Sequence, residues 1–278
     1  MSLPTYTTLR VTVTEGVADI VLDNPPVNTL NATMMVELHD LLERFRDDPS
    51  VVVLVFSSAH EEFFLAHVDM GIFDSMGELQ DVATKYPNVN VHQGIGELLR
   101  KQPQVSIVKL AGIARAGGAE FVVAADITYA AEETARIAQS EVLLGIIPGG
   151  GATQYGLERM GRNRTLETVL SAELLTARTA ADYGWINRAV PAAELDEFVA
   201  TTARNIAALG MPVIAGAKKA IPAADLTAGL NAENDAWWEL VQNERAQKIM
   251  TAAGAANMQA PENERHVEEF LRDIASTI

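Results

Sequence analysis

Segments with strand periodicity alternate with segments of helical periodicity in the first part of the chain. Residues 9–14 alternate apolar and polar side chains, and a turn leads from them into a second strand at residues 17–22. A helix follows, which Asn31 can cap and whose apolar residues recur at helical spacing over residues 34–45. Residues 51–56 are uniformly apolar, as in a fully buried strand. This order predicts an α/β core of stacked units.

The same alternation continues after a long connection. Residues 57–90 are polar and irregular, which is typical of a binding loop or a lid. Apolar patterns then predict a helix, a strand, a second helix and a further strand, at residues 91–99, at 105–110, from Gly117 onward, and at 127–130.

After about residue 150 the pattern is helical. We place a soft boundary near residue 200, between an expected catalytic core at residues 1–200 and a helical C-terminal region at residues 201–278. We expect this C-terminal region to serve oligomerisation and pocket closure. The alanine-rich run at residues 252–257 is its weakest stretch and predicts a flexible joint.

Charge and composition exclude several classes of function. The 278 residues include 21 basic and 37 acidic side chains, a net charge of −16, which disfavours nucleic acid or an anionic membrane as the main partner. There is no cysteine and no metal-ligand spacing of histidines, so we expect no metal. We find no signal-like N-terminal segment and no apolar run long enough to span a bilayer, and therefore expect a cytoplasmic protein.

Two glutamates adjoin glycine-rich backbone. Glu120 ends the segment GIARAGGAE, and Glu141 begins the segment EVLLGIIPGGG. Free N–H groups where a helix starts at Gly117 can stabilise a charged oxygen, while two carboxyl groups can move protons beside a carbonyl. Glu141 borders an apolar run, so a raised pKa is expected, which suits a general acid.

Each of these features also has a simpler interpretation. Gly117-Gly118 can serve only the close packing of a helix on a strand. Glu120 can be a first-turn residue favoured by the helix dipole, and Glu141 can be a solvated loop residue. His67, in the segment FFLAHVDM, is more often a packing residue than a catalytic one. Of the adjacent Trp237 and Trp238, we expect one to pack inside and the other to lie at a subunit contact.

Several segments, taken in order, resemble the enoyl-CoA hydratase/isomerase (crotonase) family. The resemblance covers roughly residues 8–215 and rests on residues 24–31, 64–70, 112–120, 126–127, 141–151 and 181–191. It implies a crotonase-like spiral of ββα units with a helical C-terminal region, assembled as a homotrimer or a dimer of trimers. It also implies an acyl-CoA thioester substrate and a stabilised enolate, with coenzyme A as part of the substrate and no separate cofactor.

The resemblance assigns roles to individual residues. The backbone N–H groups of Val68 and Gly117 would form an oxyanion hole, and Glu120 and Glu141 would bind water and supply the α-carbon proton. Gly149 would help to hold that water. The expected substrate-binding residues are Val27 on the pantetheine path, Ala66 near the adenine, His67 and Gly149.

The chain also departs from the family pattern. His67 replaces a glycine, Arg115 and Ala116 replace an apolar residue and a glycine, and Asn24 stands where a basic contact to coenzyme A is common. The stretch after residue 240 does not match the common family ending, so a different element is expected to close the acyl pocket. Hydration of a 2-enoyl-CoA is the favoured function. The alternatives are another crotonase-type reaction (enoyl-CoA isomerase, hydrolase or decarboxylase) and a non-catalytic acyl-CoA-binding protein.

Overall fold

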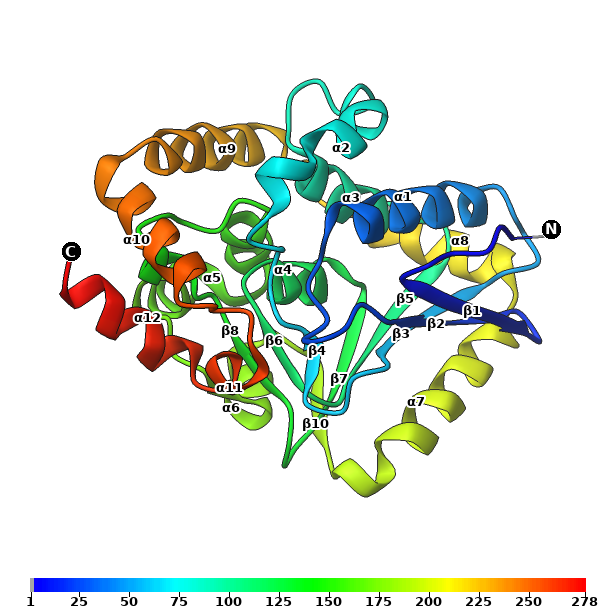
Figure 1. Ribbon diagram of the computed structural model, residues 1–278. Helices are drawn as coiled ribbons and strands as arrows, with labels where there is room; N and C mark the ends of the chain where they lie inside the picture. Colours follow the sequence, from blue (N-terminus) through cyan, green and yellow to red (C-terminus); the bar gives the residue numbers. More distant parts are fainter. Residues whose placement is uncertain (1–2) are drawn as a thin grey trace.

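Two β-sheets surrounded by helices form the centre of the computed structural model, which describes residues 3–278 (Figure 1). The larger sheet has the strand order β1-β2-β3-β5-β7-β10, and only its β1–β2 pair is antiparallel. The smaller sheet has the order β4-β6-β8-β9, and only its β8–β9 pair is antiparallel. The strands are β1 Leu9–Thr14, β2 Val17–Leu22, β3 Val53–Ser58, β4 Phe63–Leu65, β5 Val105–Leu110, β6 Ile113–Arg115, β7 Ile127–Ala131, β8 Arg136–Ala138, β9 Leu175–Thr176 and β10 Arg188–Val190.

Helices cover the sheets and make up all regular structure after β10. The α-helices are α1 Ala32–Arg46, α2 Met76–Ala83, α3 Val91–Arg100, α4 Gly117–Ala124, α5 Ala152–Ser171, α6 Ala177–Tyr183, α7 Ala192–Ala207, α8 Met211–Ala220, α9 Thr227–Val241, α10 Glu244–Ala255, α11 Pro261–Glu264 and α12 Val267–Ser276. Two short 3-10 helices, η1 Ile72–Ser75 and η2 Glu141–Leu144, precede α2 and α5.

Three consecutive turns of the chain each contribute one strand to each sheet. The strand pairs are β3 with β4, β5 with β6, and β7 with β8, and helices follow each pair before the chain returns to the larger sheet. This is the spiral of ββα units that the resemblance implied.

Local sequence signals account for much of this order. Asn31 caps α1 by accepting a 2.8 Å bond from the Met34 amide, and the predicted apolar face of α1 is buried. Asn90 caps α3 through a capping box with Gln93.

Two local predictions were wrong. The segment at residues 57–90 contains β4, η1 and α2 rather than one irregular loop, because short apolar pieces such as Phe63 and Leu79 are buried. Residues 252–255 belong to α10, where Ala253 is fully buried, so the alanine-rich run forms no joint there. Residue 200, near which we place the soft boundary, lies within helix α7.

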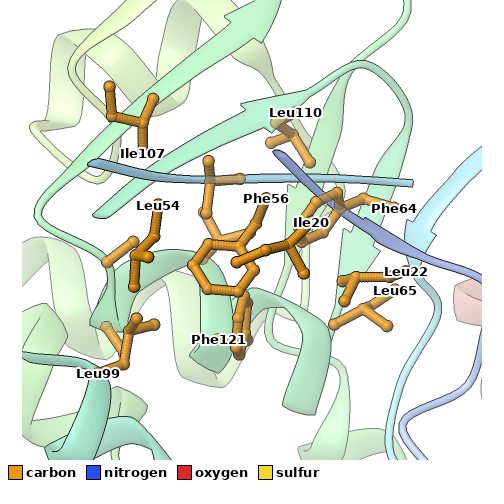
Figure 2. Close-up of a cluster of buried hydrophobic side chains, with 14 of the residues drawn as sticks. Ile20, Leu22, Leu54, Phe56, Phe64, Leu65, Leu99, Ile107, Leu110 and Phe121 are labelled. Carbon is orange, nitrogen blue, oxygen red and sulfur yellow. The ribbon is translucent and has the colours of Figure 1, made fainter. Parts of the chain in front are cut away.

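The hydrophobic core fixes the position of α4. The Phe121 ring meets the Phe56 ring edge to face at 5.2 Å between centroids, and Figure 2 shows both among aliphatic side chains of the larger sheet. Phe64, just after the start of β4, packs on the same ring at 6.4 Å. Because Phe121 follows Glu120 directly, this packing sets where the Glu120 carboxyl lies.

The helices α9 to α12, drawn in orange and red in Figure 1, lie at the end of the molecule remote from β1. Within residues 3–278, no single helix is long and apolar enough to cross a bilayer, and α7 with α8 passes that test only as a pair bent by 96°.

Candidate active site

A cavity of about 770 Å³ lies between the ββα spiral and the C-terminal helices. Its wall is formed by the loop after β4, the first turns of α3 and α4, η2, the glycine loop before α5, and faces of α9 and α10. The structure brings together six of the eight predicted site residues on this wall: His67, Val68, Gly117, Glu120, Glu141 and Gly149.

The other two predicted residues do not line the cavity. Val27 and Ala66 are both 0% exposed and pack with Phe63 in a small apolar cluster. The Ala66 amide is also occupied, since it donates to the Asn28 carbonyl at 3.2 Å. Their side chains are therefore not available to a ligand in this cavity.

The N–H groups of Val68 and Gly117 are adjacent and unpaired. Neither donates a hydrogen bond within residues 3–278. A Cβ atom on Gly117 would lie 3.3 Å from the Val68 nitrogen and 2.4 Å from Val68 Cγ2, so only glycine leaves this space open. Gly117 is also the first residue of α4, where the helix dipole favours negative charge. The arrangement fits two donors to one anionic oxygen.

The turn into α4 is strained. Ala116 has φ 47° and ψ −125°, a conformation that favours glycine. This turn aims the Gly117 amide at the cavity, and Ala116 occupies it where the resembling family has glycine.

Glu120 is a buried carboxyl held by main-chain amides. Its side chain is 3% exposed, and its Oε1 accepts bonds from Gly150 at 2.6 Å and Ala152 at 3.2 Å. These amides belong to the N-terminal end of α5, which favours negative charge there. Oε2 accepts no such bond, and it is the oxygen that remains available for chemistry.

The surroundings of the Glu141 carboxyl, unlike those of Glu120, disfavour a negative charge. Burial raises the pKa of its carboxyl well above the ordinary value, and the negative charge of Glu120 raises it further. In the orientation that satisfies both groups, the Gln139 amide nitrogen lies 3.0 and 3.1 Å from the two Glu141 oxygens. Main-chain amides thus hold the Glu120 carboxyl, whereas burial and the charge of Glu120 favour the protonated form of Glu141, an arrangement that suits separate base and acid roles.

A third buried carboxyl, Glu233 of α9, was missed by sequence reasoning. Its oxygens accept bonds from the Gly151 amide at 2.6 Å, the Thr153 amide at 3.0 Å and Gln93 Nε2 at 2.9 Å. Burial and then the charge of Glu120 raise the pKa of Glu233 to about 7. Glu233 therefore ties α9 to the glycine loop. Its surroundings in the sequence, a polar and helical stretch, contain no signal for this role.

The loop that carries Val68 is held by a buried charge network. His67 Nδ1 lies 2.7 Å from the Val68 carbonyl oxygen and Nε2 lies 3.0 Å from Glu264 Oε2. Two acceptors require two N–H donors, so the ring is the imidazolium form. Burial alone would lower the pKa of His67, but the Glu264 carboxylate, with the hydrogen bonds to Glu264 and Val68, raises it above its usual value.

Arg115 extends this network to the start of α4. Its side chain is 0% exposed and donates to Glu268 Oε1 at 2.6 Å and to the Glu264 carbonyl at 3.0 Å. His67 and Arg115, both departures from the family pattern, thus meet a pair of glutamates at α11 and α12. With its ring fully bonded, His67 has a structural role in this network.

The C-terminal helices complete the cavity. Trp237 and Trp238 of α9 both line it, and Trp237 stacks on Phe73 at 6.2 Å between centroids. Trp238 is 45% exposed. From α10 and just beyond it, the wall includes Gln247, Met250, Thr251, Gly254, Ala255 and Met258. Helices α9 and α10 therefore contribute a large part of the cavity wall.

The fold and cavity define an α/β protein built as a ββα spiral, with a paired-carboxyl site covered by C-terminal helices. A family model described as enoyl-CoA hydratase/isomerase matches residues 12–254, so the chain belongs to that family, whose members act on acyl-CoA substrates.

Comparisons with individual proteins agree with this family assignment. The structure resembles a crystal structure of a Streptomyces avermitilis protein, provisionally assigned as an enoyl-CoA hydratase, with a TM-score of 0.96 and 57% identity, covering 98% of this chain and 100% of that one. The sequence is 27% identical to the hydroxycinnamoyl-CoA hydratase-lyase of Pseudomonas fluorescens over 214 residues, 77% of each chain. It is 28% identical to the short-chain-enoyl-CoA hydratase of Clostridium acetobutylicum over 243 residues, 86% of this chain and 91% of that one.

Proposed function

We propose that the protein adds water across the double bond of a 2-enoyl-CoA. The observation that carries this proposal is the pair of carboxyls on one cavity wall, with Glu120 held by main-chain amides and the pKa of Glu141 raised by burial. Relatives named as hydratases support the reaction class.

In the proposed reaction the thioester oxygen would accept the Val68 and Gly117 N–H groups. Water, held by Glu120 and the free Gly149 amide, would attack the β-carbon and lose one proton to Glu120 Oε2. The π electrons would move toward the thioester oxygen to form an enolate, and Glu141 would give its proton to the α-carbon. The product would be a 3-hydroxyacyl-CoA, with Glu120 protonated and Glu141 ionised until a proton returns.

The main-chain donors and the two glutamates are expected to contribute different amounts to catalysis. Two main-chain donors at the enolate oxygen are the largest expected contribution, since losing one such donor typically costs about 3 kcal/mol. Acid–base catalysis by the two glutamates would add roughly 100- to 10,000-fold. The cavity lies mostly among methionine, tryptophan and other apolar side chains, which fits an apolar acyl chain.

The test is an assay of crotonyl-CoA and longer 2-enoyl-CoAs, following loss of the conjugated thioester absorbance. Glu120→Gln and Glu141→Gln should each abolish hydration while the variants still bind the product. Hydration that survives both changes would exclude this mechanism. Deuterium exchange at the α-carbon without net hydration would instead indicate isomerisation, and binding of acyl-CoA without turnover of any thioester would indicate a binding protein.

We also propose a homotrimer or a dimer of trimers. Leu166 and Leu170, four residues apart after the break in α5 at Gly161, are 39% and 64% exposed, and Leu157, before the break, is 47% exposed; exposed leucines of this kind fit a covered surface. Light scattering that gave a monomer at micromolar concentration would contradict this assembly.

A further inference from the structure

His92 is a second histidine on the cavity wall, and nothing above gives it a role. It is the second residue of α3, whose first turn is fixed by the Asn90 capping box, so its main chain is well anchored. Its side chain is only 11% exposed. Sequence reasoning tested it only for metal-ligand spacing.

Both ring nitrogens of His92 are buried without a hydrogen-bond partner among residues 3–278. His92 Nε2 lies 3.3 Å from Glu120 Oε2, close enough for electrostatic contact, but the direction is not that of a hydrogen bond. A buried unpaired polar group generally costs about 1–3 kcal/mol, so a group kept this way on a cavity wall is expected to meet a ligand.

Neighbouring glycines show where the imidazole lies. A Cβ atom on Gly150 would come within 2.3 Å of His92 Nε2 and 2.5 Å of Glu120 Oε2. A Cβ atom on Gly117 would lie 3.4 Å from the same Nε2. His92 Nε2 therefore lies near the start of α4 and 3.3 Å from the unbonded oxygen of Glu120. In the proposed reaction this is the region of the attacking water.

We infer that His92 is a third catalytic group of this site, which binds the attacking water, and the hydroxyl of the product, together with Glu120. The inference rests on the proposed hydration. With the imidazole proton on Nδ1, Nε2 accepts one water hydrogen while Glu120 Oε2 accepts the other, and an oxygen lone pair is left to attack the β-carbon. Only the proton taken by Glu120 is transferred, so His92 orients the water without a net change of charge.

His92→Leu, His92→Gln and a matched control test this role. The control is His39→Leu, because His39 is also a buried histidine with an unpaired Nε2, but it lines a different hollow on α1. With crotonyl-CoA, His92→Leu should lower kcat for hydration on the order of 100-fold, the usual cost of losing such positioning. His92→Gln should recover part of this loss, because its amide oxygen can accept the same hydrogen. His39→Leu should retain activity.

A second measurement separates a catalytic role from a structural one. Exchange of the α-proton of butyryl-CoA in deuterium oxide needs the enolate donors and a base, but no water at the β-carbon. His92→Leu should leave this exchange within about threefold of wild type. If hydration and exchange fall together, or if neither changes, the inference is wrong.

Ligand binding tests the role of His92 even if the wild-type protein does not hydrate crotonyl-CoA. A lack of hydration would count against the proposed function alone. Wild type should bind 3-hydroxybutyryl-CoA about threefold to tenfold more tightly than butyryl-CoA, the range expected for one hydrogen bond. His92→Leu should lose this preference and His39→Leu should keep it. A wild type without the preference, or a His92→Leu variant that retains it, would overturn the role of His92.

Discussion

Removing the Glu264 carboxylate is a strong test of the buried charge network. Glu264 is 0% exposed and faces His67 at 3.0 Å and Arg115 at 3.4 Å. Breaking a buried ion pair from one side generally costs about 3–5 kcal/mol. Arg115 would keep both Glu268 contacts and the Glu264 carbonyl, so the uncompensated charge lies mainly on His67. We therefore expect Glu264→Leu to lower the free energy of unfolding by about 3 kcal/mol, and Glu264→Gln by about 1.5–3 kcal/mol.

The assay is urea unfolding at one fixed protein concentration, since assembly shifts apparent stability. Glu262 lies on the same short helix but is exposed, so Glu262→Leu and Glu262→Gln are matched controls that should stay within about 0.5 kcal/mol of wild type. Glu264→Leu that is as stable as Glu262→Leu would refute the reasoning.

The pH dependence of the unfolding free energy predicts whether the effect of Glu264→Leu grows or shrinks as pH rises. The folded-state pKa of His67 is raised, so its contribution to stability is complete below the unfolded value of about 6.5 and is lost as pH rises through the folded value. Glu264, Asp69 and the Val68 carbonyl all favour the charged ring, and Glu264 is the largest of these causes. The stability gap between wild type and Glu264→Leu should therefore narrow as pH rises. If the difference in unfolding free energy between wild type and Glu264→Leu stays constant as pH rises above about 6.5, the charge of His67 does not depend on Glu264.

Four further outcomes follow from the site geometry. Glu120→Gln should lower the pKa of Glu141, read by carbon-detected NMR of the carboxyls, because the charge of Glu120 helps to raise it; an unchanged value would contradict this coupling. In wild type, the hydration rate should fall as pH rises through the raised pKa of Glu141, because the acid is lost; a rate that stays constant as pH rises would contradict the acid role of Glu141. Gly117→Ala should lower kcat/KM on the order of 100-fold, because its Cβ would lie 2.4 Å from Val68 Cγ2 and must displace the loop that carries the Val68 amide; normal kinetics would remove these donors from the reaction. Ala116→Gly should raise the free energy of unfolding by about 1 kcal/mol in chemical denaturation, by relieving φ 47°, whereas a loss of stability would mean that the turn is unstrained.

Much of the ββα spiral could be predicted because its signals are local. Strand alternation at residues 9–14, the Asn31 cap and the apolar pattern of residues 105–110 each depend on neighbours within one element. The glutamates could be found for the same reason, since each lies beside glycine-rich backbone. The resemblance then supplied the order in which these pieces meet.

The parts that could not be predicted depend on contacts between distant residues. Glu233 meets Gly151 and Thr153 across 82 and 80 positions, and His67 meets Glu264 across 197. No local pattern distinguishes a glutamate that will cap a remote helix from one that faces water. The orphaned nitrogens of His92 are equally invisible, because burial without a partner is a property of the packed chain.

The covering of the cavity by α9 and α10 has an evolutionary consequence. Every group to which we assign bond making or bond breaking lies before residue 151, whereas much of the wall an acyl tail would touch comes from residues 234–258. Substitutions in the last quarter of the chain can therefore change which thioester is accepted without changing the residues that carry out the reaction. Swapping this terminal stretch between relatives, with its glutamate partners for His67 and Arg115, offers a direct route to altered selectivity.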